Sequence, residues 1–154
     1  MILTSMIFMF GCTPMQITPL EVTDTNNRSE VIIHRESAFT AGGVNMIFGA
    51  NSNDYVKLGN GRYASMYLRP GNHELFVRSD QGDKPYLLNI DLPANETTCL
   101  RAFIDSSSVG VAVLGGPIGF LATRGSSTFN IEKIECLSKE KLSELKAVNV
   151  TYAE

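Results

Sequence analysis

The feature that most constrains the fold of this chain is a succession of short alternating or β-branched runs separated by turn residues. Seven such runs lie within residues 31–105, with no helical stretch between them. Alternation with a period of two places every second side chain on one face of a strand, so each run can bury one face. The runs are 31–35, 44–50, 55–58, two within 59–78, 86–92 and 97–105. This pattern predicts a mainly β fold, an antiparallel sandwich or open barrel of about seven to eight strands.

The stretch 59–78 is expected to form the central hairpin of this domain. Pro70 presets φ for the second position of a reverse turn, and Gly71 tolerates the positive φ that follows in a type II turn. The chain should therefore reverse between Leu68 and Leu75. The alternating apolar residues of both runs then share one face: Ala64, Met66, Leu68, Leu75 and Val77.

A last strand and a short helix are expected near the C-terminus. Residues 128–136 predict the strand. Ser138 is placed to cap a helix, and Leu137 and Leu142 have the spacing of a hydrophobic staple around that cap. The remaining residues fray or add an edge strand. Residues 30–136 are therefore expected to form the β domain, and residues 137–154 a C-terminal helix and tail.

Length and charge exclude several classes of protein. A chain of 154 residues fits one domain with a core of its own. Thirteen basic and sixteen acidic residues give a net charge of -3 without a basic cluster, which argues against nucleic acid as a partner. The most apolar runs, 2–10 and 109–121, are shorter than the ~20 residues of a membrane-spanning helix.

The N-terminal residues 1–11 are apolar, end in Gly11 and are followed by Cys12. This arrangement resembles the lipobox of bacterial lipoproteins, in which the cysteine after a small residue is acylated and becomes the new N-terminus. The resemblance implies a signal peptide over 1–11 and a lipid anchor on Cys12. The leader is short and uncharged, as expected if the start codon is assigned too far downstream. The alternative is a buried N-terminal strand with an incidental cysteine.

Residues 12–29 are expected to be a lipidated N-terminus and a tether, because prolines and asparagines are scattered through them without periodicity. Several acyl chains on one residue hold a soluble domain at a bilayer almost permanently, whereas a single chain does not. The expected location is the cell envelope, facing the periplasm. Thr13, rather than Asp, follows Cys12, which by resemblance to enterobacterial sorting favours the outer membrane.

If Cys12 carries lipid, Cys99 and Cys136 remain as a pair. In an oxidising periplasm these two residues are expected to form a disulfide. The alternative is two buried, reduced thiols. The chain has no Cys-x-x-Cys motif, so neither redox catalysis nor a zinc knuckle is favoured.

Several segments together resemble a known family. They are the lipobox-like cysteine, Ile33-His34-Arg35-Glu36, residues 54–63, residues 68–75 and the later glycine-rich stretch. Their combination resembles the bacterial lipoprotein domain of unknown function DUF 2846, and the Pro-Gly-x-His-x-Leu piece also resembles PEGA-type surface β modules. The resemblance implies a β-rich extracytoplasmic domain and supplies no catalytic residue.

The candidates for catalysis or metal binding are His34 and His73, each close in sequence to a glutamate. A metal site needs about three to four converging ligands, and the spacing of these residues does not require them to meet. We therefore expect no metal, no cofactor and no enzymatic activity. The alternative is a periplasmic hydrolase or metal-dependent enzyme that uses His34 or His73.

Tyrosines and arginines provide a candidate binding surface for sugars or peptides. The expected surface comprises Arg62, Tyr63, Tyr67, Arg69 and His73, with Tyr55 and Tyr86 as further aromatic candidates. The alternative is ordinary cross-strand pairing on a sheet surface. The apolar run 109–121 is expected to cover the sheet or, alternatively, to contact lipid or a partner. Together these features predict a lipid-anchored, non-catalytic interaction or accessory module that contacts an envelope protein or polymer.

Overall fold

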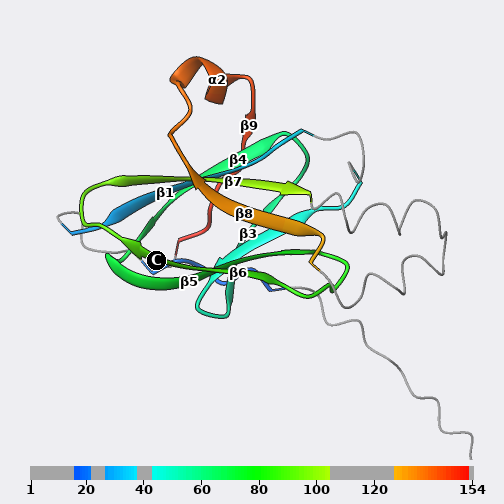
Figure 1. The fold of residues 1–154 in the computed structure, drawn as a ribbon, viewed down its shortest axis with the longest axis horizontal. Coiled ribbons are helices and arrows are strands. Elements are labelled where there is room, and N and C mark those ends of the chain that lie inside the picture. The colour runs from blue at the N-terminus through cyan, green and yellow to red at the C-terminus, as the bar shows by residue number, and fades with distance from the viewer. Residues whose placement is uncertain (1–15, 22–26, 38–42, 105–126, 153–154) are drawn as a thin grey trace, which may run out of the picture.

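The computed structural model describes residues 16–21, 27–37, 43–104 and 127–152, which form two β-sheets packed face to face (Figure 1). The five-stranded sheet has the order β8 (Phe129–Ile134), β7 (Thr97–Ile104), β1 (Ser29–Arg35), β4 (Arg62–Leu68) and β9 (Lys146–Ala147). The four-stranded sheet has the order β3 (Asn53–Leu58), β2 (Met46–Ala50), β5 (Gly71–Ser79) and β6 (Tyr86–Leu92). The predicted mainly β fold is confirmed as a sandwich rather than a closed barrel.

Most neighbouring strands are antiparallel, as predicted, but two pairs are parallel. They are β1 with β7, and β4 with β9. Parallel neighbours need a long crossover connection. Between β1 and β7 the chain passes through the opposite sheet and β4, which provides that crossover.

The predicted hairpin over 59–78 is wrong. β4 pairs with β1 and β9, whereas β5 pairs with β2 and β6, so Arg69 and Pro70 lead the chain from one sheet into the other. Gly71 does adopt a positive φ of 117°. Alternation correctly identified the buried faces of both strands, but these faces meet across the core instead of side by side in one sheet.

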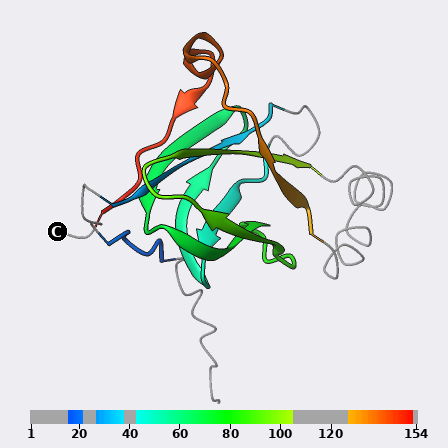
Figure 2. The same cartoon turned by 60° about the vertical axis from the view of Figure 1, so that its left-hand side comes forward.

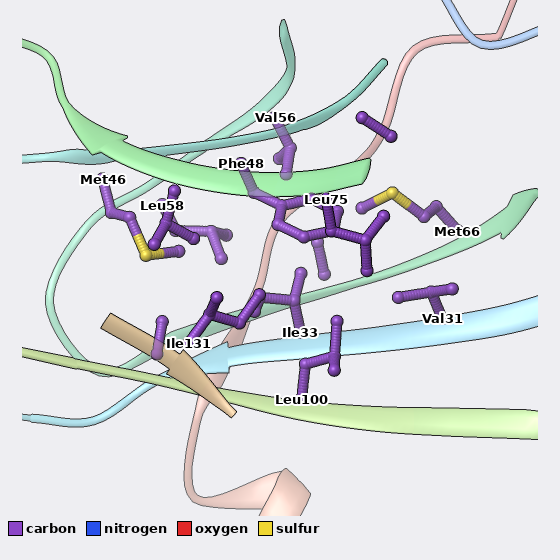
Figure 3. Packing of buried hydrophobic residues seen from close by; sticks show 14 of the residues in the cluster. Val31, Ile33, Met46, Phe48, Val56, Leu58, Met66, Leu75, Leu100 and Ile131 are labelled. Carbon is purple, nitrogen blue, oxygen red and sulfur yellow. The ribbon is translucent and has the colours of Figure 1, made fainter. Parts of the chain in front are cut away.

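The core lies between the sheets and is built from the alternating apolar residues of both (Figure 3). Met46, Phe48, Val56, Leu58 and Leu75 come from the four-stranded sheet. Val31, Ile33, Met66, Leu100 and Ile131 come from the five-stranded sheet and face them. This interdigitation fixes which face of each strand is buried.

Arg35 is buried at the end of this core with 1% of its surface exposed. Its Nη1 donates to the carbonyls of Val44 and Leu58, and its guanidinium lies 4.9 Å from the ring centroid of Phe129. Since Arg35 belongs to β1 and Leu58 to β3, the side chain ties the two sheets together. Charge-assisted hydrogen bonds of this kind offset the cost of burying a cation.

Residues 16–21 pack against the domain, although they lie in the stretch expected to be a tether. The amide of Thr18 donates to the carbonyl of Asp54 at 2.7 Å, and that of Leu20 to the carbonyl of Thr151 at 2.9 Å. The Leu20 side chain is 3% exposed and joins the core. Figure 2 shows this blue segment beside the red C-terminal tail. A tether extending to residue 29 is therefore wrong, because an apolar side chain in the middle of the segment is more stable inside the core than in water.

The predicted disulfide is present: Cys99 is bonded to Cys136, with their Cα atoms 5.0 Å apart. Thr98 and Leu100, the neighbours of Cys99 on β7, face the core. Because side chains alternate along a strand, the bridge lies on the outer face of the five-stranded sheet. Because β8 and β9 are the outer strands of that sheet, residues 135–145 pass from one edge to the other. The alternative of two reduced thiols is wrong.

The crossing segment contains the predicted short helix, α2 (Lys139–Ser143), which rises above the five-stranded sheet in Figure 1. The hydroxyl of Ser138 accepts a hydrogen bond from the Lys141 amide at 3.4 Å, which confirms Ser138 as the N-cap. β9 follows and adds the edge strand that the sequence left as one alternative for the tail.

Three predicted features lie outside the described residues: the signal peptide over 1–11, the lipid acceptor Cys12 and the apolar run 109–121. Among the helices that the structure describes, none has the length and apolar character to cross a bilayer.

Candidate binding cleft

A cleft of about 400 Å³ lies where the N-terminal segment, the β2–β3 turn and the β4–β5 connection meet. Three segments that are distant in the sequence supply its walls. The lining residues are Thr18, Pro19, Leu20, Glu21, Asn51, Asn53, Tyr55, Tyr67, Leu68, Arg69 and His73. Its volume is in the range of small-ligand sites, which combine apolar walls with a few placed polar groups.

A β-bulge places Tyr55 at this cleft. In the β2–β3 pair, Phe48 is opposite Val56 but Gly49 is opposite Asp54, which leaves Tyr55 as the extra residue. Bulges re-aim a side chain and are frequent near functional sites. Burial raises the pKa of the Tyr55 phenol, and the nearby Glu21 carboxylate raises it further although a hydrogen bond with Asn53 opposes both. Tyr55 therefore presents a neutral hydroxyl to the cleft.

The β2–β3 turn is held against β5 by Asn51. Asn51 and Ser52 have positive φ values of 50° and 70°, which asparagine tolerates better than most residues. The Asn51 amide donates to the Glu74 carbonyl at 2.9 Å, and its Oδ1 accepts from the Glu74 amide at 3.2 Å. These two bonds hold the β2–β3 turn, which forms one wall of the cleft, in place against β5.

Both ring nitrogens of His73 are hydrogen-bonded within the protein. Nε2 lies 2.8 Å from the carbonyl oxygen of Arg69, and Nδ1 lies 3.2 Å from Nδ2 of Asn51. The neutral tautomer with hydrogen on Nε2 satisfies both contacts, since Nε2 then donates to Arg69 and Nδ1 accepts from Asn51. His73 therefore acts as a clamp between the β2–β3 turn and the β4–β5 connection.

The structure does not bring His34 near His73. His34 lies on β1, opposite Tyr63 of β4 and Arg101 of β7, whereas His73 lies on β5 in the other sheet. Burial lowers the pKa of His34, and the positive charge of Arg101 adds to this effect, whereas Glu36 and the Leu100 backbone oppose it. In the described part of the chain, no group of three or more His, Cys, Asp or Glu side chains is placed to hold a metal ion.

The rim of the cleft carries one ion pair. Nη2 of Arg69 lies 2.8 Å from Oε2 of Glu21, and the side chains remain 72% and 77% exposed, respectively. Both groups therefore stay accessible to a ligand. Their charges are opposite, so the pair adds polarity to the rim without adding net charge.

Two residues far apart in the sequence, Arg28 and Tyr152, hold Tyr67. The guanidinium of Arg28 lies 3.7 Å from the centroid of the Tyr67 ring, in a cation–π contact. The hydroxyl of Tyr152 accepts a hydrogen bond from the Tyr67 amide at 3.2 Å. These contacts fix the ring and the strand that carries it.

The predicted binding surface is divided by this geometry. Tyr67, Arg69 and His73 line the cleft, together with Tyr55. Arg62 and Tyr63 are not among the lining residues; they lie at the other end of β4, where they pair with β9. Tyr86 lies on the edge strand β6.

Sequence reasoning missed Glu21, Asn51 and Asn53 as cleft residues. The cluster of turn-forming residues at 51–54 marked a turn, but nothing in its composition indicated what the turn faces. A second, more open depression of about 410 Å³ lies over β5 and β6. Its side chains are Asn72, His73, Glu74, Asn89, Ile90 and Asp91, and this set contains no aromatic group except His73.

Comparison of the chain with family models, with curated proteins and with solved structures finds no match in any of the three. The resemblance to DUF 2846 therefore stays a prediction from the motifs, and the function is argued from the cleft.

Proposed function

We propose that this chain is a lipid-anchored binding module of a bacterial cell envelope, held through Cys12 and facing the periplasm. Its role is non-catalytic, and the cleft is the site at which it contacts an envelope protein or polymer. The outer membrane is the proposed location of the anchor.

The observation that carries this proposal is that polar groups from separate segments converge on the cleft and are already ordered there. Asn51 and His73 are held by hydrogen bonds to each other, to Glu74 and to Arg69. Ordering these groups before binding reduces the entropy that a ligand must offset. Because the two nitrogens of His73 serve these contacts, the arrangement favours a binding role over that of a general base.

The position of the cleft relative to Cys12 supports attachment close to a membrane. Gln16, the first described residue, follows Cys12 by four positions. A chain spans at most about 3.6 Å per residue, so an acylated Cys12 would lie within about 14 Å of Gln16. The Cys99–Cys136 disulfide supports an oxidising compartment such as the periplasm.

Site-specific crosslinking in the native envelope tests the proposal. A photoreactive residue replaces Asn53, an exposed cleft residue, in the full-length chain. The matched control carries the same group at Leu87, which is 50% exposed on β6. We expect an envelope component to be captured from position 53 and not from position 87, and mass spectrometry to find acyl chains on Cys12. Equal capture from both positions, or an unmodified Cys12, would contradict the proposal.

A further inference from the structure

We infer that the ligand of the cleft is a carbohydrate chain. This inference rests on the proposed function and names the chemical class of the polymer. Four features of the cleft support it: the charge balance, the two tyrosine rings, the arrangement of polar groups, and the hydrogen bonds that already occupy nearby backbone carbonyls.

Charge balance favours an uncharged ligand. Among the described residues that line the cleft, Glu21 is the one carboxylate and Arg69 the one guanidinium, and the two are paired. Phosphate-rich ligands are bound by several cationic groups or by clustered backbone amides. A ligand of neutral hydroxyl groups can instead use both members of the pair, since hydroxyls donate to the carboxylate and accept from the guanidinium.

Tyr55 and Tyr67 both line the cleft next to these polar groups, and Arg28 covers one face of the Tyr67 ring, which leaves the rest of that ring to a ligand. A tyrosine ring offers a large and rigid contact area at low conformational cost, and its hydroxyl remains available for hydrogen bonding. The C–H face of a sugar ring is apolar, whereas its rim carries hydroxyls. Partly buried tyrosines beside exposed amide, carboxylate and guanidinium groups match both parts of such a ring.

The side-chain amide of Asn53, at the end of the β2–β3 turn, extends this match. Asn53 is exposed at the cleft, and its Nδ2 is 3.4 Å from the carbonyl oxygen of Asn51. An amide carries a donor and an acceptor on one planar group, as neighbouring hydroxyls of a sugar require. The bonds of Asn51 to Glu74 and His73 hold the turn next to this amide.

Backbone pairing makes an extended peptide a poorer match. Peptides that add a strand to a sheet need free backbone groups at its edge. Beside the cleft, the carbonyl of Asp54 already accepts from Thr18, and the carbonyl of Thr151 accepts from Leu20. The N-terminal segment thus uses edge groups that such a peptide would need, while the side chains of the cleft remain accessible.

Binding is tested with the full-length chain carrying Cys12→Ser, which removes the acceptor sulfur and separates sugar recognition from anchoring. The soluble probes are oligosaccharides of N-acetylglucosamine, of glucose and of galactose, measured by titration calorimetry. Phosphatidylcholine vesicles that carry a galactosyl lipid test the same chemistry at a membrane, with plain phosphatidylcholine vesicles as the reference. Binding of a soluble oligosaccharide identifies a polysaccharide as the source. Binding to the vesicles with galactosyl lipid alone identifies a glycolipid headgroup.

Two pairs of variants assign any binding to the cleft. Tyr67→Leu should weaken it about fivefold, the equivalent of the about 1 kcal/mol that an aromatic contact contributes, whereas Tyr86→Leu on the edge strand should leave it unchanged. Arg69→Gln should weaken it several-fold, and Arg62→Gln, at the other end of the same strand, should not. Arg69 is largely exposed, so we expect Arg69→Gln to fold normally. This variant therefore tests the cleft even if Tyr67→Leu disturbs β4.

Failure of every saccharide and glycolipid probe to bind, or binding that the Tyr67 and Arg69 variants leave unchanged, would overturn the inference. Capture of a protein from position 53 together with no saccharide binding would overturn it and leave the proposed binding module intact. Absence of cleft-dependent capture together with no saccharide binding would overturn both.

Discussion

The two long sides of the sandwich are completed in different ways. On one side, the edge strand β3 and the tail that follows β9 adjoin residues 16–21, with backbone hydrogen bonds from Thr18 to Asp54 and from Leu20 to Thr151. On the other side, β6 lies against β8, the adjoining loops are joined by polar contacts, and Leu87 stays 50% exposed. We call these the covered side and the open side.

The difference shows where a binding site can be built. The open side is formed by strands and their own connecting loops, whereas the covered side also receives segments from both ends of the described chain. The cleft lies on the covered side, at its end next to β5. Residues 16–21 pack beside an edge strand, so they can form one wall of a cleft without interrupting the strand pairing that stabilises the domain.

The largest expected effect comes from removing the Cys99–Cys136 disulfide, which lies just before the segment that crosses to β9 and the covered side. A Cys99→Ala/Cys136→Ala double variant removes a bridge that closes a loop of 37 residues. The free energy of unfolding should fall by about 4 kcal/mol, because the unfolded chain regains the entropy of that loop. Urea unfolding under oxidising conditions measures this. The unaltered chain in the presence of reductant should show the same loss, and a loss below about 1 kcal/mol would contradict the expectation.

A smaller but still large effect is expected from Leu20→Ala. Leu20 is almost completely buried in the core on the covered side, so truncation should lower the free energy of unfolding by about 3 kcal/mol. The matched variant Leu87→Ala, on the open side, should change it by less than about 0.5 kcal/mol. Equal effects in urea unfolding would show that the N-terminal segment is not part of the folded core.

Two asparagines with positive φ provide the next comparison. Asn51 has a φ of 50° and Asn95 a φ of 59°, and glycine accepts both conformations. Asn51→Gly also removes the side-chain bonds to Glu74 and His73, so we expect a loss of about 1–2 kcal/mol and weaker ligand binding. Asn95→Gly should stay within about 0.5 kcal/mol. Thermal unfolding of the two variants side by side distinguishes a shared backbone effect from the specific contacts of Asn51.

The smallest effect concerns His34, which lies on the five-stranded sheet away from the cleft. Because its pKa in the folded protein is lowered by burial, the unfolded chain binds a proton more readily. The contribution of neutral His34 to stability is therefore present above the ordinary histidine pKa of about 6.5 and is lost as the pH falls below it. His34→Gln should flatten the dependence of stability on pH between about 7 and 5. An unchanged slope in unfolding experiments would contradict this expectation.

Much of the local structure follows from the sequence. Alternation located the strands over 86–92 and 97–105 closely, and Ser138 identified the start of α2. Gly71 has the positive φ that was predicted for it, although the hairpin itself does not form. The pairing of Cys99 with Cys136 followed once Cys12 was set aside as the expected lipid acceptor. These features depend on a residue and its near neighbours, or on a count of cysteines, and such information is contained in the sequence.

The arrangement of strands and the cleft were decided only by the tertiary structure. Alternation shows which face of β4 or β5 is buried, but two buried faces can lie side by side in one sheet or opposite each other across a core. The docking of Leu20, the placement of Tyr55 and Tyr67 at one cleft and the contact of Asn51 with His73 all depend on that choice. Each joins residues far apart in the chain, and the energy that holds them comes from burial and hydrogen bonding that exist only once both sheets have packed.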